Sequence, residues 1–276
     1  MFVDLSNYKE NMNKIILFLT LLLIILVSFI KYNETNYLRD LDQNSFKRGE
    51  YLQYDVSYGF FNAAKATLEI DNNIHKINNR NSFRIIGKGK SSGTLRWFFK
   101  VDDRYETYVD EKSILPHKFI RRVREGNYSL DREINFNQYT KKAIVYQKDT
   151  QQFNIDTNSQ DLLSTLYYAR TLDLNSAKID QEFIINTFFD KQMYPLKIRF
   201  LGKEDIETDL GEFSCLKFRP LLQEGRVFKE QEDMTIWISD DLNKIPIRLK
   251  TNLLVGSIKM DLVKFRNLKH KLEKIK

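Results

Sequence analysis

Cysteine, proline and glycine are scarce in this chain of 276 residues, which contains one, four and ten of them, respectively. The single cysteine excludes an intramolecular disulfide, so apolar burial and backbone pairing must hold the fold together. The few prolines and glycines, beside 42% hydrophobic and 29% charged residues, exclude a collagen-like or low-complexity chain and are typical of a globular protein. Cys215 lies in the strand-like run FSCLKF and is interpreted as a small buried hydrophobic residue, the alternative being a reactive thiol.

Motifs for metal and cofactor binding are also missing. The sequence contains no H-E-x-x-H, no phosphate-binding glycine loop and no dinucleotide fingerprint. His75, His117 and His270 are far apart and have no acidic or cysteine partners at metal-ligand spacing. We therefore expect no metal and no cofactor, and we assign no catalytic residue. An envelope hydrolase would require distant acidic or histidine residues to converge in a pocket.

Two acidic pairs stand where strands are expected to end, Asp102-Asp103 and Asp240-Asp241. Aspartate favours turns because its carboxylate accepts hydrogen bonds from nearby backbone N–H groups. The alternative is a carboxylate pair for acid–base work or a cation. Neighbouring residues of a strand point to opposite faces, so such a pair would need a bend in order to cooperate.

The net charge of +7 is spread along the chain, because no block of five or more consecutive basic residues occurs. This argues against a nucleic-acid partner. Arg121, Arg122 and Arg124, with Arg132 and Lys141-Lys142 nearby, concentrate positive charge on strands expected to be adjacent. We interpret them as part of a solvated sheet face. The alternative is a surface that contacts anionic envelope components such as lipid headgroups and weakens with salt.

An apolar segment, residues 15–30, has Thr20 and Ser28 as its only polar members. As a helix it would be about 24 Å long at ~1.5 Å per residue, shorter than the roughly 30 Å hydrocarbon core of a bilayer. This length favours an export signal over a stable membrane span. We therefore predict that residues 1–30 are a signal peptide, or an anchor at the inner membrane if uncleaved, with Met12 as the true start. The protein is expected in the periplasm or cell envelope.

Alternating apolar and polar residues dominate the sequence from residue 49 to residue 265, and this pattern predicts antiparallel strands. One helical pattern interrupts them at residues 160–172. Residues 31–48 form a polar linker, and residues 266–276 form a basic tail. The predicted fold is mainly β, a single antiparallel sheet curled into a barrel or half-barrel with one packed helix. The strand candidates include residues 83–88, 97–101, 104–109, 118–124 and 128–136, and a hairpin is expected over residues 247–262.

The chain resembles the domain of unknown function 3108 family of exported bacterial proteins over most of residues 49–265. The similarity lies in five segments, which are, in order, YDVSYGFFNAAKATLEI, GTLRWFFKVDDRYETYVDEKSILPHKFIRRVREGNY, QDLLSTLYYAR, TDLGEFSCLKFRP and WISDDLNKIPIRLKTNLLVGSIKMDL. Ala63-Ala64 departs from the family pattern, in which a glycine is expected nearby. The resemblance implies an exported protein with a mainly β fold, and it brings no established activity.

A curled sheet can either fill its interior with side chains or enclose an apolar ligand. We therefore predict a non-catalytic protein that binds an apolar or amphipathic envelope molecule, with the helix as plug or lid. The alternative is a structural or assembly partner recognised through exposed strand edges. The ligand identity and the oligomeric state are left open. The candidate lining residues are Tyr54, Tyr58, Trp97, Phe98, Tyr105 and Tyr108.

Overall fold

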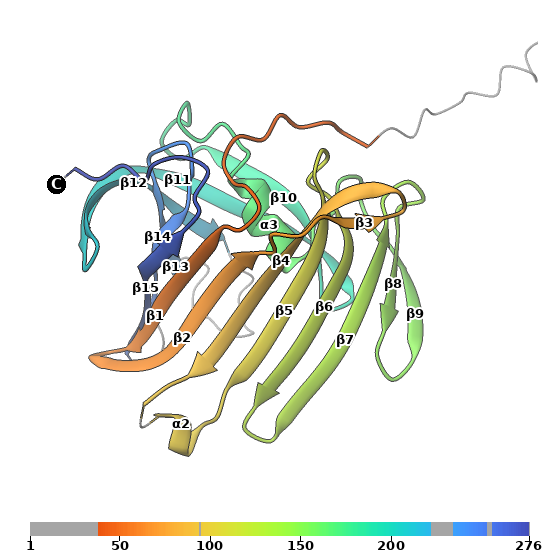
Figure 1. Ribbon diagram of the computed structural model, residues 1–276, viewed down its shortest axis with the longest axis horizontal. Helices are drawn as coiled ribbons and strands as arrows, with labels where there is room; N and C mark the ends of the chain where they lie inside the picture. The colour runs from red at the N-terminus through yellow and green to blue at the C-terminus, as the bar shows by residue number, and fades with distance from the viewer. Residues whose placement is uncertain (1–37, 94, 222–233, 253–255, 276) are drawn as a thin grey trace, which may run out of the picture. The chain divides into compact units, whose positions relative to one another are not determined.

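A computed structural model describes residues 38–93, 95–221, 234–252 and 256–275, and Leu38–Lys276 form one compact unit. Within these residues the chain forms one antiparallel sheet of fifteen strands and two helices (Figure 1). The segment predicted as an export signal lies outside the described residues. Among the described helices, neither is long and apolar enough to cross a membrane.

Most strands lie where the alternating pattern of the sequence predicts them, and neighbouring strands pair antiparallel. Their bounds are β1 Tyr51–Tyr58, β2 Phe61–Ile70, β3 His75–Ile77, β4 Arg80–Ser91, β5 Asp102–Asp110, β6 Pro116–Glu125, β7 Tyr128–Asn137, β8 Lys142–Tyr146, β9 Thr150–Asn154, β10 Glu182–Phe189, β11 Gln192–Thr208, β12 Gly211–Leu221, β13 Met234–Ser239, β14 Pro246–Asn252 and β15 Ser257–Arg266. The helices are α2, Leu95–Phe98, and α3, Leu162–Ala169.

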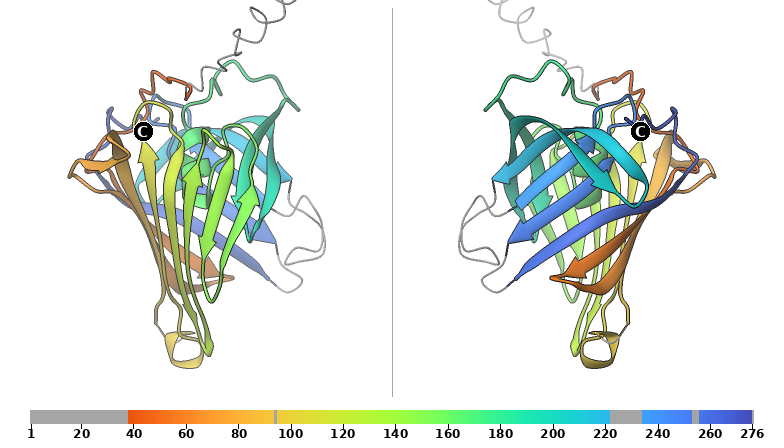
Figure 2. Two further views of the ribbon diagram at one scale, coloured as in Figure 1. Left: turned by 90° about the vertical axis from the view of Figure 1, so that its right-hand side faces the viewer. Right: turned by 90° about the vertical axis from the view of Figure 1, so that its left-hand side faces the viewer.

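The sheet is curled but not closed. Its order is β10-β11-β12-β13-β14-β15-β1-β2-β4-β5-β6-β7-β8-β9, with β3 paired to β4 alone, so β9 and β10 are its edges. The two halves stand opposite each other, with β10 to β14 facing the strands from β4 to β7 (Figure 2). The prediction of one mainly antiparallel sheet is confirmed, in an open form.

Helix α3 lies inside the curl and packs against β5 and β10. It begins at Asp161, whose carboxylate accepts hydrogen bonds from the backbone N–H groups of Leu163 (2.8 Å) and Ser164 (2.9 Å). This cap satisfies N–H groups that have no partner within the helix. Leu163 then joins a core cluster with Phe119, Ile134 and other buried residues of the sheet.

The segment 97–101 was predicted as a strand, and this is wrong. Residues 95–98 instead form the single turn α2 between β4 and β5. The guanidinium of Arg96 donates to the backbone carbonyls of Ser91 (3.3 Å) and Val101 (3.4 Å), which lie on either side of the turn. The aromatic residues that suggested a strand are therefore carried on a short connection.

Candidate functional site

The inner face of the sheet, the face toward α3, is densely packed near the helix and less so toward the opposite end. We call that opposite end the open end; it carries the β1–β2 turn at residues 59–60, α2, and the β6–β7 turn at residues 126–127. Along β1, Leu52 and Tyr54 are buried at 0% and 1% exposure, Val56 is half-buried, and Tyr58 is 42% exposed. Side chains therefore stop filling the interior toward this end.

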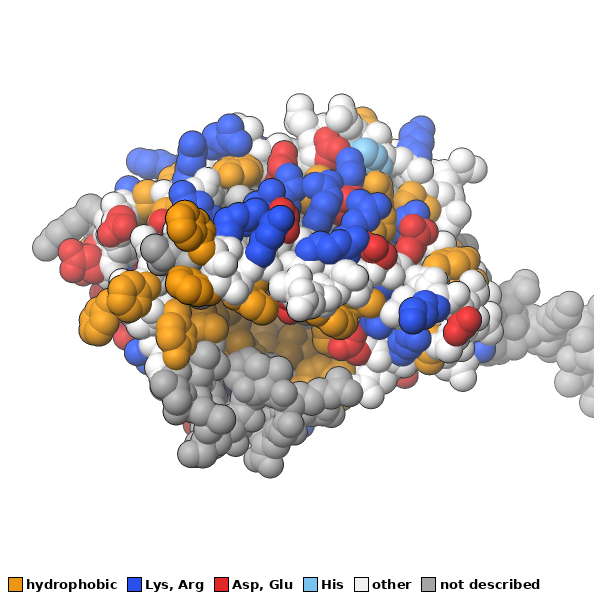
Figure 3. All heavy atoms as spheres, turned by 90° about the horizontal axis from the view of Figure 1, so that it is seen from below, with side chains coloured by type: hydrophobic (Ala, Val, Ile, Leu, Met, Phe, Trp, Pro, Cys, Tyr) orange, Lys and Arg blue, Asp and Glu red, His pale blue; other side chains and the backbone are white. Residues whose placement is uncertain are grey.

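The interior changes from packed to open between two glycines of β4, Gly87 and Gly89. A Cβ atom on Gly87 would lie 3.2 Å from Leu163 Cδ2, so this glycine makes room for α3. Gly89 lies two residues further along the same face, and a Cβ atom there would have no neighbour within 4 Å among the described residues. Figure 3, which views the molecule from the open end, shows a hollow with hydrophobic walls.

Apolar side chains from four strands form the wall beside Gly89. Ala66 of β2 is directly opposite Gly89 on one side and Tyr54 on the other. Val56 of β1 is directly opposite Met260 of β15, which in turn is opposite Leu249 of β14. These side chains are half-buried, with the exception of Tyr54, so they leave apolar surface facing the hollow.

A group of charged residues interrupts this apolar wall. Arg121 of β6 is directly opposite Arg132 of β7, and both donate to Oδ1 of Asp190 in the β10–β11 turn, at 2.9 and 2.8 Å. The Arg121 guanidinium also lies over the rings of Tyr105 and Phe189, at 5.8 and 5.2 Å. Its Nε is buried and makes no hydrogen bond to the described residues. The side chains of Arg121 and Asp190 keep 17% and 32% exposure, so other atoms of this charged group can reach a polar ligand atom.

Acidic groups adjoin this pair of arginines. Burial, followed by the charge of Asp103, raises the pKa of Glu125. Asp103 itself is buried and accepts a hydrogen bond from the backbone N–H of Arg124 (2.9 Å). The inner wall thus offers hydrogen-bond donors and acceptors next to an apolar surface, an arrangement suited to a molecule with a polar and an apolar part.

The structure places three of the six predicted lining residues on the inner face and three elsewhere. Tyr54 and Tyr105 lie on the inner face, where Tyr105 packs against Phe119. Tyr58 shares the face of Tyr54 at the open end. Tyr108 lies on the outer face, where its ring is 5.8 Å from the Arg84 guanidinium. Trp97 and Phe98 are 92% and 86% exposed on α2 and do not line the interior.

Two of the three predicted surface arginines lie on the outer face of the sheet, and the third lies on the inner face. Arg122 and Arg124 are exposed on the outer face, and Arg124 makes two hydrogen bonds to Asp131 at 2.9 and 2.7 Å. Arg121 points to the inner face, because successive residues of a strand alternate between faces. It therefore cannot be part of one surface with Arg122.

Asp190 and Gly89 were not identified from the sequence, and Arg132 was noted only as a basic residue near Arg121, Arg122 and Arg124. For Arg132 a signal exists, because it interrupts an alternating apolar series between the buried residues Leu130 and Ile134. For Asp190 no local signal exists, since its role depends on the β10–β11 turn reaching the inner face of β6 and β7.

The remaining polar candidates have structural roles. His75 bonds Asp71 (3.0 Å), His117 is buried 3.5 Å from Asp110, and His270 contacts the carbonyl of Asn44 (2.6 Å). Asp241 accepts hydrogen bonds from Ser239 and from the backbone of Asn243, as a turn residue would. Over the described part of the chain, no three histidine, cysteine or acidic residues are placed to hold a metal ion.

One short stretch, Gly89-Lys90-Ser91-Ser92-Gly93, fits the G-x-S-x-G spacing of serine hydrolases. Ser91 is 4% exposed at the end of β4, and its hydroxyl accepts a hydrogen bond from the backbone N–H of Val101 (2.9 Å). This serine ties β4 to the start of β5, so its contacts are those of a structural residue.

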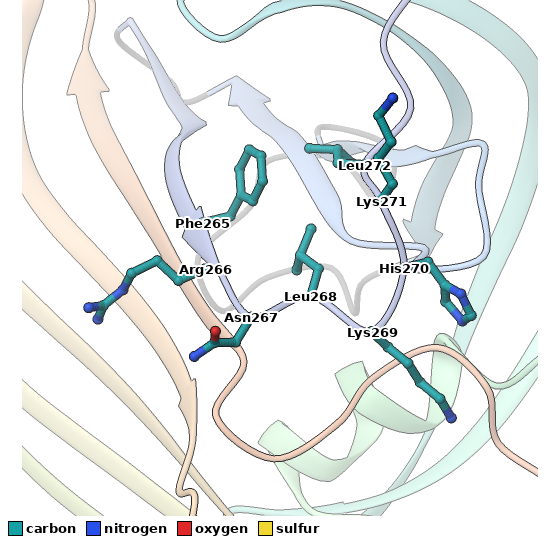
Figure 4. Close-up of a pocket in the computed structure, with 8 residues that line it drawn as sticks. All are labelled: Phe265, Arg266, Asn267, Leu268, Lys269, His270, Lys271 and Leu272. Atoms are coloured by element: carbon teal, nitrogen blue, oxygen red, sulfur yellow. The ribbon is translucent and has the colours of Figure 1, made fainter.

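A second concave surface lies at the far end of β15, away from the open end. Residues 265–272 line this groove of about 540 Å³ (Figure 4). Phe265, Leu268 and Leu272 turn toward one another there and pack on the core cluster that contains Leu52 and Leu262. The groove is thus the place where the last residues of the chain cover the sheet, and its apolar groups are already partnered.

The curled sheet, the enclosed helix and the apolar hollow define a β-barrel-like protein with an accessible interior. The chain belongs to the family described as Protein of unknown function (DUF3108), whose model matches residues 53–263. This confirms the resemblance found in the sequence.

Two solved structures are similar to the chain. The β-barrel-like protein of domain of unknown function DUF1849 from Brucella abortus is 7% identical with a TM-score of 0.51, over 81% of this chain and 99% of that one. This likeness shows a shared fold. The CT021 protein of Chlamydia trachomatis is 8% identical and has a lower TM-score of 0.36, over 80% of this chain and 87% of that one. No curated protein matches the chain.

Proposed function

We propose that this protein works outside the cytoplasm and binds an apolar or amphipathic molecule in the hollow of its curled sheet. The observation that carries the proposal is the unfilled interior at Gly89, beside half-buried apolar side chains of neighbouring strands. Apolar surface that stays accessible to water costs free energy, about 25 cal/mol per Å², and a ligand that covers it recovers this free energy. An apolar molecule therefore has a driving force to enter.

The charged group at Arg121 favours an amphipathic ligand over a purely apolar one. The partly exposed guanidinium of Arg121 can donate to an oxygen of a ligand, and a hydrogen bond to a charged group contributes about 1.5–3 kcal/mol. Because Asp190, Asp103 and Glu125 are nearby, a neutral or zwitterionic polar group also finds partners. The polar part of the ligand is thus expected beside β6.

The apolar segment at residues 15–30 supports a location in the cell envelope, as a cleaved signal or as an anchor. Amphipathic molecules of the envelope are the class that such a protein would meet there. The proposal does not include a catalytic step.

The test is native mass spectrometry and solvent extraction of the purified protein, followed by rebinding of a fluorescent fatty acid. Gly89→Phe places a ring in the open space and should lower the amount of bound molecule at least fivefold. Lys90→Phe, one residue further along and on the outer face, is the matched control and should bind as the wild type does. Equal loading of wild type and Gly89→Phe, or no bound molecule in any preparation, would overturn the proposal.

The edges of the sheet favour a second candidate, a partner in envelope assembly. Strand β9 is an edge strand and is largely exposed, and it contacts the β10–β11 hairpin through side chains, so its backbone can pair with a strand of another protein. Crosslinking through a photoreactive residue at Gln151 of β9 should then recover one protein in stoichiometric amount. A diffuse set of products would contradict this second candidate.

A further inference from the structure

A row of three cations crosses the outer face of the sheet near the open end. Lys88 of β4 is directly opposite Arg104 of β5, which is directly opposite Arg122 of β6. Arg104 is paired with Glu106 (2.6 Å), whereas Lys88 and Arg122 form no ion pair with any described residue. Like charges directly opposite each other destabilise a sheet, so this row has a cost to the free protein.

Aromatic side chains project from the connections at the open end. Phe60 and Phe61 are 103% and 76% exposed at the β1–β2 turn, Trp97 and Phe98 are 92% and 86% exposed on α2, and Tyr128 is 54% exposed beside the β6–β7 turn. Single exposed apolar residues are ordinary, but five large aromatic ones gathered at the end of one sheet are not. We call them the aromatic rim. Figure 3 shows hydrophobic groups along this edge and Lys and Arg side chains on the adjoining face.

The connections that carry the rim are held together by hydrogen bonds. The two bonds from Arg96 close the loop around α2, and the N–H of Gly126 donates to the carbonyl of Lys100 (2.8 Å). The N–H of Ser92 donates to the carbonyl of Ala63 at the start of β2 (2.9 Å). The aromatic side chains are therefore presented from a fixed backbone, which lowers the entropy cost of binding a surface.

We propose that the aromatic rim and the cation row dock the open end of the protein on an anionic lipid bilayer. Aromatic side chains favour the boundary between lipid and water. Lys88 and Arg122 lie three residues from the ends of their strands, about 10 Å from the turns at ~3.3 Å per residue, where their long side chains reach lipid headgroups. Charge complementarity therefore identifies a membrane, in preference to an apolar protein surface, as the occupant.

Docking in this way would place the mouth of the hollow against the lipid. It does not depend on the binding proposal, because it rests on the outer face and the turns. A protein that docks but carries no molecule would leave this inference standing, and a protein that carries a molecule without docking would remove it alone.

The experiment follows Trp97 fluorescence in the full chain mixed with lipid vesicles. Of the two tryptophans, Trp237 is buried at 8% exposure and serves as the internal reference. Vesicles of phosphatidylcholine with 30% phosphatidylglycerol and brominated acyl chains should quench Trp97 emission and shift it to shorter wavelength. The measured quantity is the emission of Trp97 and not the amount of protein on the vesicles. Attachment through residues 15–30 alone, with Trp97 left in water, would therefore not give a positive result.

Charge variants test the cation row. Lys88→Gln with Arg122→Gln should reduce the apparent affinity for the anionic vesicles about tenfold or more, as should 0.5 M salt in the wild type. Lys112→Gln with Lys178→Gln, which removes two exposed cations elsewhere, is the matched control and should have less than a twofold effect. If aqueous acrylamide reaches Trp97 equally with and without vesicles, the inference is overturned. A Trp97 shift that depends on protein concentration without lipid would overturn it in favour of self-association.

Discussion

At the scale of single residues, Asp161 is a carboxylate that the fold both needs and buries. It caps α3, accepts a hydrogen bond from Thr107 Oγ1 (2.5 Å) and is fully buried. Burial raises its pKa from 3.8 to about 6, although the hydrogen bonds from Ser164, Thr107 and Leu163 oppose the rise. Between these two pH values the folded protein holds a proton that the unfolded chain has lost.

The stability that Asp161 contributes should therefore be fully present below about pH 4 and be lost as the pH rises through about 6. The loss is about 3 kcal/mol at ~1.36 kcal/mol per pKa unit. Asp161→Asn keeps a neutral cap, so urea unfolding of this variant should lack that decrease. The exposed substitution Asp131→Asn is the control. Parallel curves of unfolding free energy against pH for wild type and Asp161→Asn would contradict the prediction.

Cys215 gives a second prediction at this scale. Its side chain is buried at 0% exposure, and burial raises the pKa of the thiol to about 12. Since the thiolate is the reactive form, iodoacetamide at pH 7.5 should label the native protein at least a hundredfold more slowly than the unfolded chain. Measured labelling rates that are similar in the two states would show that the β11–β12 hairpin opens readily.

At the scale of elements, the C-terminal end of α3 is held by a buried ion pair. Arg170 and Glu50 are 1% and 0% exposed and share two hydrogen bonds of 2.6 and 2.8 Å. The guanidinium also donates to the carbonyls of Ser45 and Asn243, each at 3.0 Å. One side chain thus joins the helix to the segment before β1 and to the β13–β14 connection.

Removing one partner should leave a buried charge without compensation. Arg170→Met is expected to lower the free energy of unfolding by about 3–5 kcal/mol, measured by urea denaturation. The double variant Arg170→Met with Glu50→Leu should recover a large part of this loss, because it removes the second charge as well. If the double variant lost a further amount of about 3–5 kcal/mol of unfolding free energy relative to Arg170→Met, the uncompensated charge of Glu50 would not explain the loss in the single variant.

The elements also show how far the sequence predicts the fold. Alternation predicted β1 and β2, β4 to β8, β10 to β13 and the β14–β15 hairpin, but not the short β3, because a half-buried sheet imposes a period of two on its side chains. It did not predict β9, whose residues are exposed except for the half-buried Phe153. It misjudged residues 97–101, since aromatic residues in a connection resemble those of a strand. The candidate site was less predictable, because Arg132, Asp190 and Gly89 acquire their roles only when distant strands meet.

At the scale of the whole molecule, side chains bridge the gap that hydrogen-bonded strands leave open. Asp190 binds Arg121 and Arg132, Lys191 donates to Gln151 of β9 (3.0 Å), and the rings of Phe153 and Phe188 are 5.7 Å apart. These contacts join the β10 edge to the strands from β6 to β9. The sheet is therefore held nearly shut without a ladder at this seam.

Asp190→Ala should weaken the seam, because it leaves two facing arginines without their shared carboxylate. We expect a loss of about 1–3 kcal/mol in unfolding free energy and faster hydrogen exchange of the β10 amides. Asp131→Ala, which removes the exposed partner of Arg124, is the matched control and should change stability by less than about 0.5 kcal/mol. Unchanged exchange in β10 would mean that other contacts hold the seam.

The pairing of β1 with β15 brings residues 51 and 266 side by side in the middle of the sheet. A chain that emerges from the ribosome from its N-terminus therefore cannot complete this ladder until residue 266 has been synthesised. Contacts between such distant positions are slow to form, and until then apolar strands such as β1 stay exposed to aggregation. Maturation of this protein should accordingly depend on a holding chaperone during biosynthesis.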